Sequence, residues 1–530
     1  MRKVLFIIPN KLADIPEHLL CDLIGPKIIP YGILSCIAYA NAKSHFDIEF
    51  KVLDLNTKSG GSEVYENIIV KTMVDFKPNV VGISVLFNNL VNQLLTISSI
   101  VKNTMPECLV IAGGTCASND YKSILYSTEY IDGICYSEGE IPLFRLLSAE
   151  DMHKQLYVDP SFITKSSLVE KKTPTASFVD DLTQIPFLDY SLVNVKSYET
   201  YRTGPTAFND DDVAISIHTT RGCPFNCIFC CAFNVHGKKL RYMSAKYTLD
   251  FVNYMIDSYG LTFLNIEDDN FFVNKKRAKR IMKDLAVLKQ QGKLKCVNIL
   301  NVAVQYIDEE IVELFKALDI SNVSISSEHG TEYMLNEVIE KPCSLDQIKK
   351  VVKLLKNYDV NHSASIVMGI PGEREIDRLE AVKFYIELGA DWVSVLIATP
   401  FKGSRLYELC IEKGYIDPKD LAYANTRRSI INTPDISATE ITEKAYLMNL
   451  ELNFINNYHI RIGDYVPAIT RFSDLANRHE DHAFAHYCLA EAYKGIGDKN
   501  KYSEQLDCFF EIVNRVPKWK EYALHFGIIN

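Results

Sequence analysis

Three cysteines lie close together in the sequence, at Cys223, Cys227 and Cys230. Because only three and then two residues separate them, one loop can present three thiols to the same site. Thiolates are soft ligands that suit iron–sulfur clusters. A [4Fe-4S] cube has four irons, so three local cysteines leave one iron open to a ligand from outside the protein. The spacing therefore predicts a [4Fe-4S] cluster with one open coordination position.

Zinc and ferredoxin sites fit the cysteine group less well. A structural zinc site usually has four ligands, often in two separated pairs, and the sequence shows no second pair. An electron-transfer ferredoxin needs a fourth cysteine, and Cys231 directly follows Cys230, so we expect its side chain to point elsewhere. Chance clustering is disfavoured because Gly222 and Pro224 shape the loop.

Residues 220–230, with Phe229 before the last cysteine, resemble the cysteine motif of the radical S-adenosylmethionine (SAM) superfamily. The resemblance implies that the open iron chelates the amino and carboxylate groups of SAM. One electron, from a donor such as flavodoxin or ferredoxin, then cleaves SAM into methionine and a 5′-deoxyadenosyl radical. That radical abstracts a hydrogen atom from the substrate. The resemblance also implies that Phe229 lies near the adenine.

An acidic stretch at residues 265–271 follows a predicted strand. In the family, this place carries the motif that holds the SAM ammonium, and a carboxylate suits a cation. Asp268 and Asp269 are the preferred candidates, with Glu267 third. The alternative is an ordinary acidic helix start, which the helix dipole favours.

Four more features match the family in order and spacing. Glu328 ends the fourth predicted strand, and the resemblance implies that it contacts the SAM ribose hydroxyls. Lys341 occupies the position of a frequent family lysine that faces a SAM carboxylate. Gly369 begins a Gly-x-Pro-Gly-Glu turn at which backbone approaches the ligand. Residues 399–404 resemble the turn that closes the family's barrel.

The hydrophobic pattern predicts an α/β scaffold for these motifs. Residues 1–150 alternate buried strands with helices, which indicates a doubly wound, Rossmann-like sheet. Residues 151–205 lose this rhythm and are interpreted as a linker. Residues 206–425 contain six strand–helix units, which predict a partial (β/α)6 TIM-type barrel. Residues 426–530 have no strand pattern, and we expect a helical C-terminal domain.

The expected strands are 3–8, 50–55, 80–86, 109–112 and 131–136 in the first part, and 214–218, 263–267, 296–302, 323–326, 363–368 and 392–397 in the second. In the helical part, residues 481–517 resemble one tetratricopeptide helix pair. An ordinary helical hairpin is the alternative.

The first part also resembles the cobalamin (B12)-binding-type domain that precedes many radical SAM domains. The matching segments, in family order, are 30–34, 52–55, 78–84, 112–114 and 138–140. The resemblance implies that cobalamin lies over the carboxyl ends of the strands, against Gly113 and Gly114. The Asp-x-His-x-x-Gly element, whose histidine ligates cobalt in other cobalamin proteins, is absent, which excludes that mode of ligation.

Two reactions fit these motifs. The first is cobalamin-dependent methylation of an unreactive carbon or phosphorus centre in a natural-product or peptide substrate. The second is a cobalamin-independent radical peptide epimerase or cyclase with a cysteine hydrogen donor, for which Cys343 is the candidate and a structural cysteine the alternative. A methylthiotransferase is disfavoured because the N-terminal cysteines lack the spacing of a second cluster. A non-enzymatic redox or scaffold protein would leave the SAM motifs unused.

The composition and hydrophobicity of the chain limit the classes of partner that we expect. The formal net charge of -10 disfavours a polyphosphate partner, which prefers a basic surface. No apolar run approaches the roughly 20 residues of a membrane helix, and the first residues do not match a signal peptide. We therefore expect a cytoplasmic enzyme that acts on a small-molecule or peptide substrate, with no nucleic-acid or membrane partner.

Overall fold

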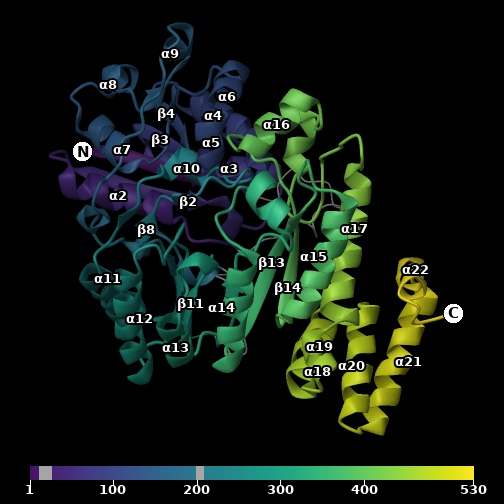
Figure 1. Cartoon of the computed structure of the whole chain (residues 1–530). Helices are drawn as coiled ribbons and strands as arrows, with labels where there is room; N and C mark the ends of the chain where they lie inside the picture. Colours follow the sequence, from purple (N-terminus) through teal and green to yellow (C-terminus); the bar gives the residue numbers. More distant parts are fainter. Residues whose placement is uncertain (11–26, 199–207, 210) are drawn as a thin grey trace. The chain divides into compact units, whose positions relative to one another are not determined.

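The computed structural model describes residues 1–10, 27–198, 208–209 and 211–530 (Figure 1). The chain divides into two compact units. The first unit contains Met1–Val323 and Thr399–Asn425, and the second contains Ser324–Ala398 and Thr426–Asn530.

The N-terminal part of the first unit is a six-stranded sheet in the order β2-β1-β3-β4-β5-β6. Its strands are β1 (Arg2–Ile8), β2 (Ile48–Asp54), β3 (Val80–Ser84), β4 (Leu109–Gly113), β5 (Gly133–Cys135) and β6 (Phe162–Ile163). The first five strands are parallel, and their order 2-1-3-4-5 is that of a doubly wound fold. The predicted Rossmann-like sheet is therefore confirmed.

Alternating side chains bury both faces of this sheet. Leu5 and Ile7 belong to a core with α3 (Ser62–Phe76), α4 (Val91–Thr104), α5 (Thr115–Asn119) and α6 (Tyr121–Ser127). Val4 and Phe6 belong to the opposite core, with α2 (Tyr31–Lys43) and α7 (Glu140–Ser148). This two-sided burial explains why central strands such as β3 and β4 are nearly continuous apolar runs.

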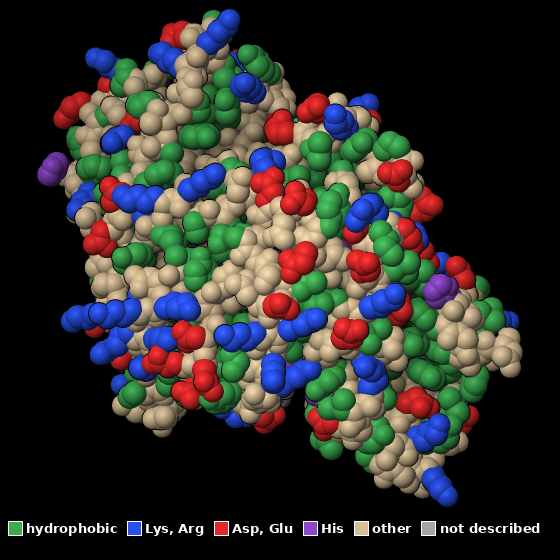
Figure 2. Space-filling model, in the orientation of Figure 1, with side chains coloured by type: hydrophobic (Ala, Val, Ile, Leu, Met, Phe, Trp, Pro, Cys, Tyr) green, Lys and Arg blue, Asp and Glu red, His purple; other side chains and the backbone are tan. Residues whose placement is uncertain are grey.

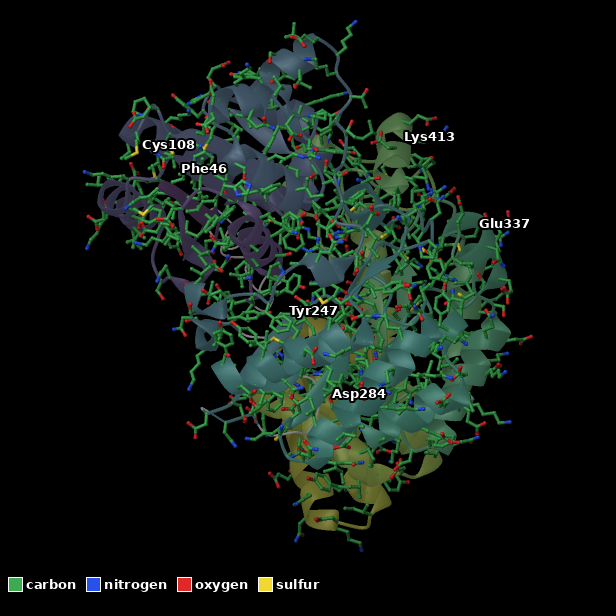
Figure 3. The ribbon with its side chains drawn as sticks, turned by 90° about the vertical axis from the view of Figure 1, so that its left-hand side faces the viewer. Phe46, Cys108, Tyr247, Asp284, Glu337 and Lys413 are labelled. Atoms are coloured by element: carbon green, nitrogen blue, oxygen red, sulfur yellow. The ribbon has the colours of Figure 1, made fainter. Side chains whose placement is uncertain are left out.

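Residues 151–198 contain more structure than the predicted linker. They form α8 (Met152–Val158), β6, α9 (Lys165–Val169) and three short 3-10 turns. Strand β6 pairs antiparallel with β5 and so extends the sheet. Further along, Ile185 accepts a hydrogen bond from the hydroxyl of Tyr247, which Figure 3 labels. Residues 199–205 of the predicted linker lie outside the described residues, as do 206–207 at the start of the next predicted domain.

All six strands predicted for residues 206–425 are present, in two three-stranded sheets. The first unit holds β7 (Val213–Ile217), β10 (Leu261–Ile266) and β11 (Cys296–Ile299), in the order β11-β10-β7. Strands β12 (Val323–Ile325), β13 (His362–Met368) and β14 (Trp392–Ile397) form the other sheet. The longer α-helices between them are α11 (Ala245–Tyr259), α12 (Lys275–Gln290), α13 (Glu309–Ala317), α14 (Leu345–Asn357) and α15 (Glu375–Leu388).

Three short elements of the first unit were not predicted. Strands β8 (Thr220–Arg221) and β9 (Arg241–Tyr242) pair antiparallel, and α10 (Ala232–His236) lies between them in the sequence. Together they bracket the segment that contains the three predicted cluster cysteines. A further helix, α16 (Arg405–Lys413), follows the turn at residues 399–404.

The C-terminal part of the second unit is helical, as predicted. It contains α17 (Ala438–Leu450), a π-helical turn (Glu451–Ile455), α18 (Tyr458–Ile462), α19 (Tyr465–Arg478), α20 (Ala483–Gly495), α21 (Lys499–Arg515) and α22 (Pro517–His525). These helices share a core that includes Phe454, Phe472, Phe484 and Phe509. Helices α20 and α21 form the expected helix pair, and their classification as a tetratricopeptide repeat stays a prediction.

The surface carries charges of both signs. Figure 2 shows Lys and Arg side chains beside Asp and Glu side chains over α12 and α13, where Lys279 contacts Glu310 at 2.7 Å. In the described part of the chain, no helix is both long enough and apolar enough to cross a membrane.

Candidate functional site

The cysteine segment of the first unit is a tight loop between β8 and α10. Cys227 is buried, and Cys223 and Cys230 are half-buried. Gly222 begins the loop with φ +90°, and a Cβ there would lie 2.5 Å from the carbonyl oxygen of Lys239. Only glycine fits this position. Burial raises the pKa of the Cys230 thiol to about 11, so a bound metal must displace its proton.

The acidic loop after β10 binds this cysteine loop. Both carboxylate oxygens of Asp268 accept hydrogen bonds from Thr219, one from its backbone N–H and one from its hydroxyl at 2.6 Å. Asp269 accepts from the backbone N–H of Gly222 at 2.8 Å. The next residue, Asn270, contacts the Cys223 sulfur through Nδ2 at 3.9 Å. Three consecutive residues therefore bind the segment that leads into Cys223.

The three carboxylates predicted to hold the SAM ammonium are placed differently. Glu267 and Asp269 line a cavity, whereas Asp268 is fully buried and engaged by Thr219. Burial raises the pKa of both Glu267 and Asp268, and hydrogen bonds from Ser216 and Thr219, respectively, oppose that rise. Glu267 and Asp269 are therefore better placed than Asp268 to meet a ligand in the cavity, which reverses part of the predicted preference.

The cavity has a volume of about 410 Å³. Its wall includes Ser84, Gly113 and Gly114 from the sheet domain and Thr220 and Arg221 beside the cysteine loop. It lies at the carboxyl ends of β3 and β4, next to the point where the strand order reverses, which is where doubly wound folds bind ligands. Residues from both predicted domains therefore share one cavity within the first unit.

Gly113 and Gly114 differ in whether the surrounding structure has room for a side chain at that position. Gly114 has φ +103°, and a Cβ there would lie 2.6 Å from the carbonyl oxygen of Val85, so the turn requires glycine. At Gly113 the nearest atom to an added Cβ is 3.8 Å away, on Cys135. Gly113 thus leaves open space that a bulky cofactor can occupy.

A buried ionic network joins the sheet domain to the cysteine loop. Glu138 contacts Arg221 at 3.1 Å, Arg241 at 2.6 Å and His236 at 2.7 Å, and Glu140 contacts Arg221 at 2.7 Å. Burial alone would raise the pKa of Glu138, but the charge of Arg221 and hydrogen bonds from Arg241 and His236 lower it well below its ordinary value. The carboxylates come from the predicted 138–140 motif, and their partners were not predicted.

His218 is a second cavity residue that the sequence did not single out. Its ring packs against Tyr31 with 4.9 Å between centroids, and the Tyr31 hydroxyl donates to the His218 carbonyl at 3.0 Å. Burial lowers the pKa of His218 to about 4, so the imidazole is neutral at physiological pH. In the sequence, only the position of His218 at the end of the predicted strand 214–218 indicated that it could belong to the site.

Aromatic residues flank the cysteines. Phe229, predicted to lie near the SAM adenine, is half-buried beside Cys230. Phe225 stacks on Tyr306 with 6.0 Å between centroids and an interplanar angle of 6°. Tyr306 comes from a distant segment and was not predicted.

In the second unit, two predicted SAM contacts pair with each other. The Lys341 ammonium lies 2.6 Å from the Glu328 carboxylate, and Glu328 has the left-handed φ of +62°. Gly369 has φ +78° and donates its N–H to Glu373 at 2.7 Å. Cys343 is 4% exposed, and burial raises the pKa of its thiol to about 11. A buried thiol with a high pKa resembles an ordinary structural cysteine.

The donor set of the cysteine loop fits a cluster. Within the described ranges, no three His, Cys, Asp or Glu side chains converge as ligands of a single metal ion. Thiolates of a [4Fe-4S] cube bind three different irons and so need not converge on one point. Asn270 supports the fit, because its buried Oδ1 has no hydrogen-bond partner beside Cys223. For cobalamin, the candidate space is the cavity at the strand ends, where Gly113 has room beside its backbone.

Comparisons with known proteins agree with this geometry. A family model described as the radical SAM superfamily matches residues 217–385, and one described as a B12 binding domain matches residues 18–147. The chain is 26% identical to the cytidylyl-2-hydroxyethylphosphonate methyltransferase of Streptomyces wedmorensis, over 73% of this chain and 77% of the relative. It is 23% identical to the anaerobic magnesium-protoporphyrin IX monomethyl ester cyclase of Rubrivivax gelatinosus, over 77% of this chain and 69% of the relative.

A solved structure shows the same fold. The cobalamin-dependent SAM radical enzyme OxsB, with aqua-cobalamin and SAM bound, aligns with a TM-score of 0.64 at 15% identity, covering 100% of this chain and 82% of OxsB. Together with the two family models, this similarity confirms the predicted order of a B12-binding domain, a radical SAM domain and a helical C-terminal region. The chain therefore contains a radical SAM domain preceded by a B12-binding domain and is a radical SAM enzyme, and the cofactors that these domains take are a [4Fe-4S] cluster, SAM and cobalamin.

Proposed function

We propose that the enzyme methylates an unreactive carbon or phosphorus centre of a small-molecule or peptide substrate in a cobalamin-dependent reaction. The observation that carries this proposal is the single cavity whose wall combines Gly113 and Gly114 of the B12-binding domain with Thr220 and Arg221 next to the cluster cysteines. A shared cavity allows a methyl carrier and a radical source to meet the same substrate.

The residues of the chain have distinct roles in this proposal. When bound, the cluster and SAM supply a 5′-deoxyadenosyl radical, and cobalamin supplies the methyl group. Cys223, Cys227 and Cys230 hold the cluster. Glu267 and Asp269 attract the SAM ammonium, since both carboxylates line the cavity.

Other residues shape the surroundings. Gly113 and Gly114 let the cofactor approach the strand ends, and Phe229 contacts the adenine. In the second unit, Glu328, Lys341 and Gly369 contribute to SAM binding through the ribose, the carboxylate and the backbone turn, respectively. The buried Glu138–Arg221 pair keeps the cysteine loop against the B12-binding domain. We further propose that flavodoxin or ferredoxin delivers the electron.

The relatives support a small-molecule methyl acceptor. The Streptomyces wedmorensis relative is named as a methyltransferase of a cytidylyl phosphonate, and the similarity covers 77% of its length. The cyclase relative favours a second candidate, radical cyclisation without methyl transfer. The epimerase alternative depends on Cys343, whose burial offers it no support.

A label experiment distinguishes these candidates. With SAM carrying a deuterated methyl group, methylation raises the product mass by about 14 Da plus the label, because the methyl comes from SAM through cobalamin. Cyclisation adds no methyl, and epimerisation leaves the unlabelled mass unchanged but takes deuterium from heavy water. The variant with Cys223, Cys227 and Cys230 all changed to Ala provides the inactive control. A product without a SAM-derived methyl, formed at the normal rate, would contradict the proposal.

A further inference from the structure

Asn270 stands out within the acidic loop because it carries no charge and is almost completely buried. Its residue surface is 2% exposed. Its Nδ2 donates to the Cys223 sulfur at 3.9 Å, and its Oδ1 is buried without a hydrogen-bond partner. A buried amide with one group satisfied and the other not is costly, which suggests that a ligand completes its hydrogen bonds.

We propose that Asn270 is a positioning residue for the iron–sulfur cluster: its N–H donates to the Cys223 sulfur and raises the reduction potential of the cluster, and its oxygen accepts a hydrogen bond from the SAM amino group. The inference rests on the cluster and SAM alone, so it holds whichever reaction follows.

The two halves of the amide act in different ways. A hydrogen bond to a cysteine sulfur stabilises the more negatively charged, reduced cluster and therefore makes reduction easier. The Oδ1 atom can only accept, so it needs an N–H or O–H donor, and the loop itself provides none. The SAM amino group is such a donor, because it keeps two N–H bonds when its nitrogen coordinates the open iron, and the neighbouring carboxylates of Glu267 and Asp269 can also accept from it.

The neighbours of Asn270 explain why its amide is held in place. Asp268 is fixed by Thr219, and Asp269 is fixed by the backbone N–H of Gly222. Both contacts anchor the loop on the segment immediately before Cys223. The Asn270 side chain therefore has little freedom to turn away from the sulfur.

Two variants separate the functions of the amide. Asn270→Leu has a similar shape and removes both the donor and the acceptor. Asn270→Asp keeps an oxygen acceptor and, when ionised, has no donor. A matched control is Asn298→Leu, because Asn298 is also 2% exposed but bonds to Asn265 in the neighbouring strand.

The measurements are the midpoint potential of the cluster by redox titration and the change in its reduced electron paramagnetic resonance spectrum on adding SAM, both at pH 8. We expect a more negative midpoint potential in both Asn270 variants and an unchanged one in Asn298→Leu. We also expect about tenfold weaker SAM binding in Asn270→Leu, as loss of one hydrogen bond predicts, but not in Asn270→Asp.

Three outcomes would overturn the inference: a wild-type potential in both Asn270 variants, an equal shift in Asn298→Leu, or SAM binding unchanged in Asn270→Leu. If both Asn270 variants fold, by circular dichroism, but lose iron that Asn298→Leu retains, the positioning role is supported directly. Because none of these measurements requires the substrate, failure of the methylation proposal leaves them unaffected.

Discussion

Asp268, Asp269 and Asn270 show how one short loop can hold another through single side-chain contacts. Hydrogen bonds to charged groups contribute about 1.5–3 kcal/mol each. The loop they bind lies between β8 and α10 and has no helix or strand of its own, so these side-chain contacts help to hold it in place. The acidic loop therefore compensates for the lack of regular structure around the cysteines.

The three cysteines should be essential, and their neighbour should not. Changing Cys223, Cys227 or Cys230 to Ala removes one of three protein ligands, so we expect loss of most of the roughly four irons per chain and of reductive SAM cleavage. Cys231→Ala is the matched control, since Cys231 is also half-buried and directly follows Cys230. Iron content and methionine formation are the measurements. Normal SAM cleavage in the triple variant would refute the assignment.

Among single residues, the candidate ligands of the cluster and of SAM were easier to identify from the sequence than the residues that contact and support them. The cysteine spacing and the acidic stretch are local patterns, so Cys223 and Asp269 could be identified from type and order. Arg241 could not, because its partner Glu138 lies 103 positions away and a buried ion pair leaves no periodic signal. Tyr306 was missed for the same reason, since its contact with Phe225 depends on the tertiary fold.

At the scale of elements, long strands were predictable and short ones were not. Buried parallel strands such as β1 and β4 are nearly continuous apolar runs, which a sequence shows directly. Strands β6, β8 and β9 have two residues each, too few for any periodicity. Their pairing is decided by neighbours in the fold, and for that reason β6 was missed and residues 151–205 were interpreted as a linker.

A polar contact fixes the helical part of the second unit to its sheet. His459 on α18 contacts Asp391, just before β14, at 3.2 Å and Asp464 at 3.1 Å. Burial lowers the pKa of His459, but the hydrogen bonds and charges of these two carboxylates outweigh it and raise the pKa above its ordinary value. His362 also faces Asp391, at 3.3 Å, and burial lowers its pKa.

The His459 contact should make stability depend on pH. Because its folded pKa is raised, its contribution is complete below the ordinary value near 6.5 and is lost as the pH rises through the folded pKa. We expect the thermal midpoint to fall between pH 6 and pH 9, and to fall less in His459→Gln. His362 acts oppositely, since its lowered pKa removes stability only as the pH falls below 6.5.

Differential scanning calorimetry at several pH values provides the measurement. His525→Gln is the control, because His525 is an exposed histidine on α22. An identical pH dependence in wild type and His459→Gln would show that the Asp391 contact does not stabilise the tail.

At the scale of the whole molecule, the compact units do not follow the predicted domain boundaries. The first unit joins the B12-binding domain to the first three strands of the radical SAM domain and to the turn at 399–404. Gly403 shows how close that contact is, since its carbonyl accepts a hydrogen bond from Asn234 at 2.7 Å. The residues of the proposed cobalamin and cluster sites are thus parts of one folded unit, which the order of motifs along the chain could not reveal.

Because the two proposed sites lie in one unit, a useful test is a substitution that blocks the cobalamin site and leaves the cluster site unchanged. Gly113 lines the cavity, has room for a Cβ, and is not among the glycines with positive φ, so Gly113→Leu can fold normally while its side chain fills the cavity. Crowding of about 1–3 kcal/mol corresponds to cobalamin binding weakened roughly 10- to 100-fold. Iron content and SAM cleavage should stay at wild-type values, because the cysteine loop and its acidic partner are unchanged.

Gly61→Leu, at an exposed glycine before α3, is the control. Binding is measured from the absorbance of hydroxocobalamin that remains after gel filtration, and the wild-type spectrum should lack histidine ligation. If Gly113→Leu retains cobalamin as well as wild type does, the cavity is not the cobalamin site, and the methyl carrier must bind elsewhere.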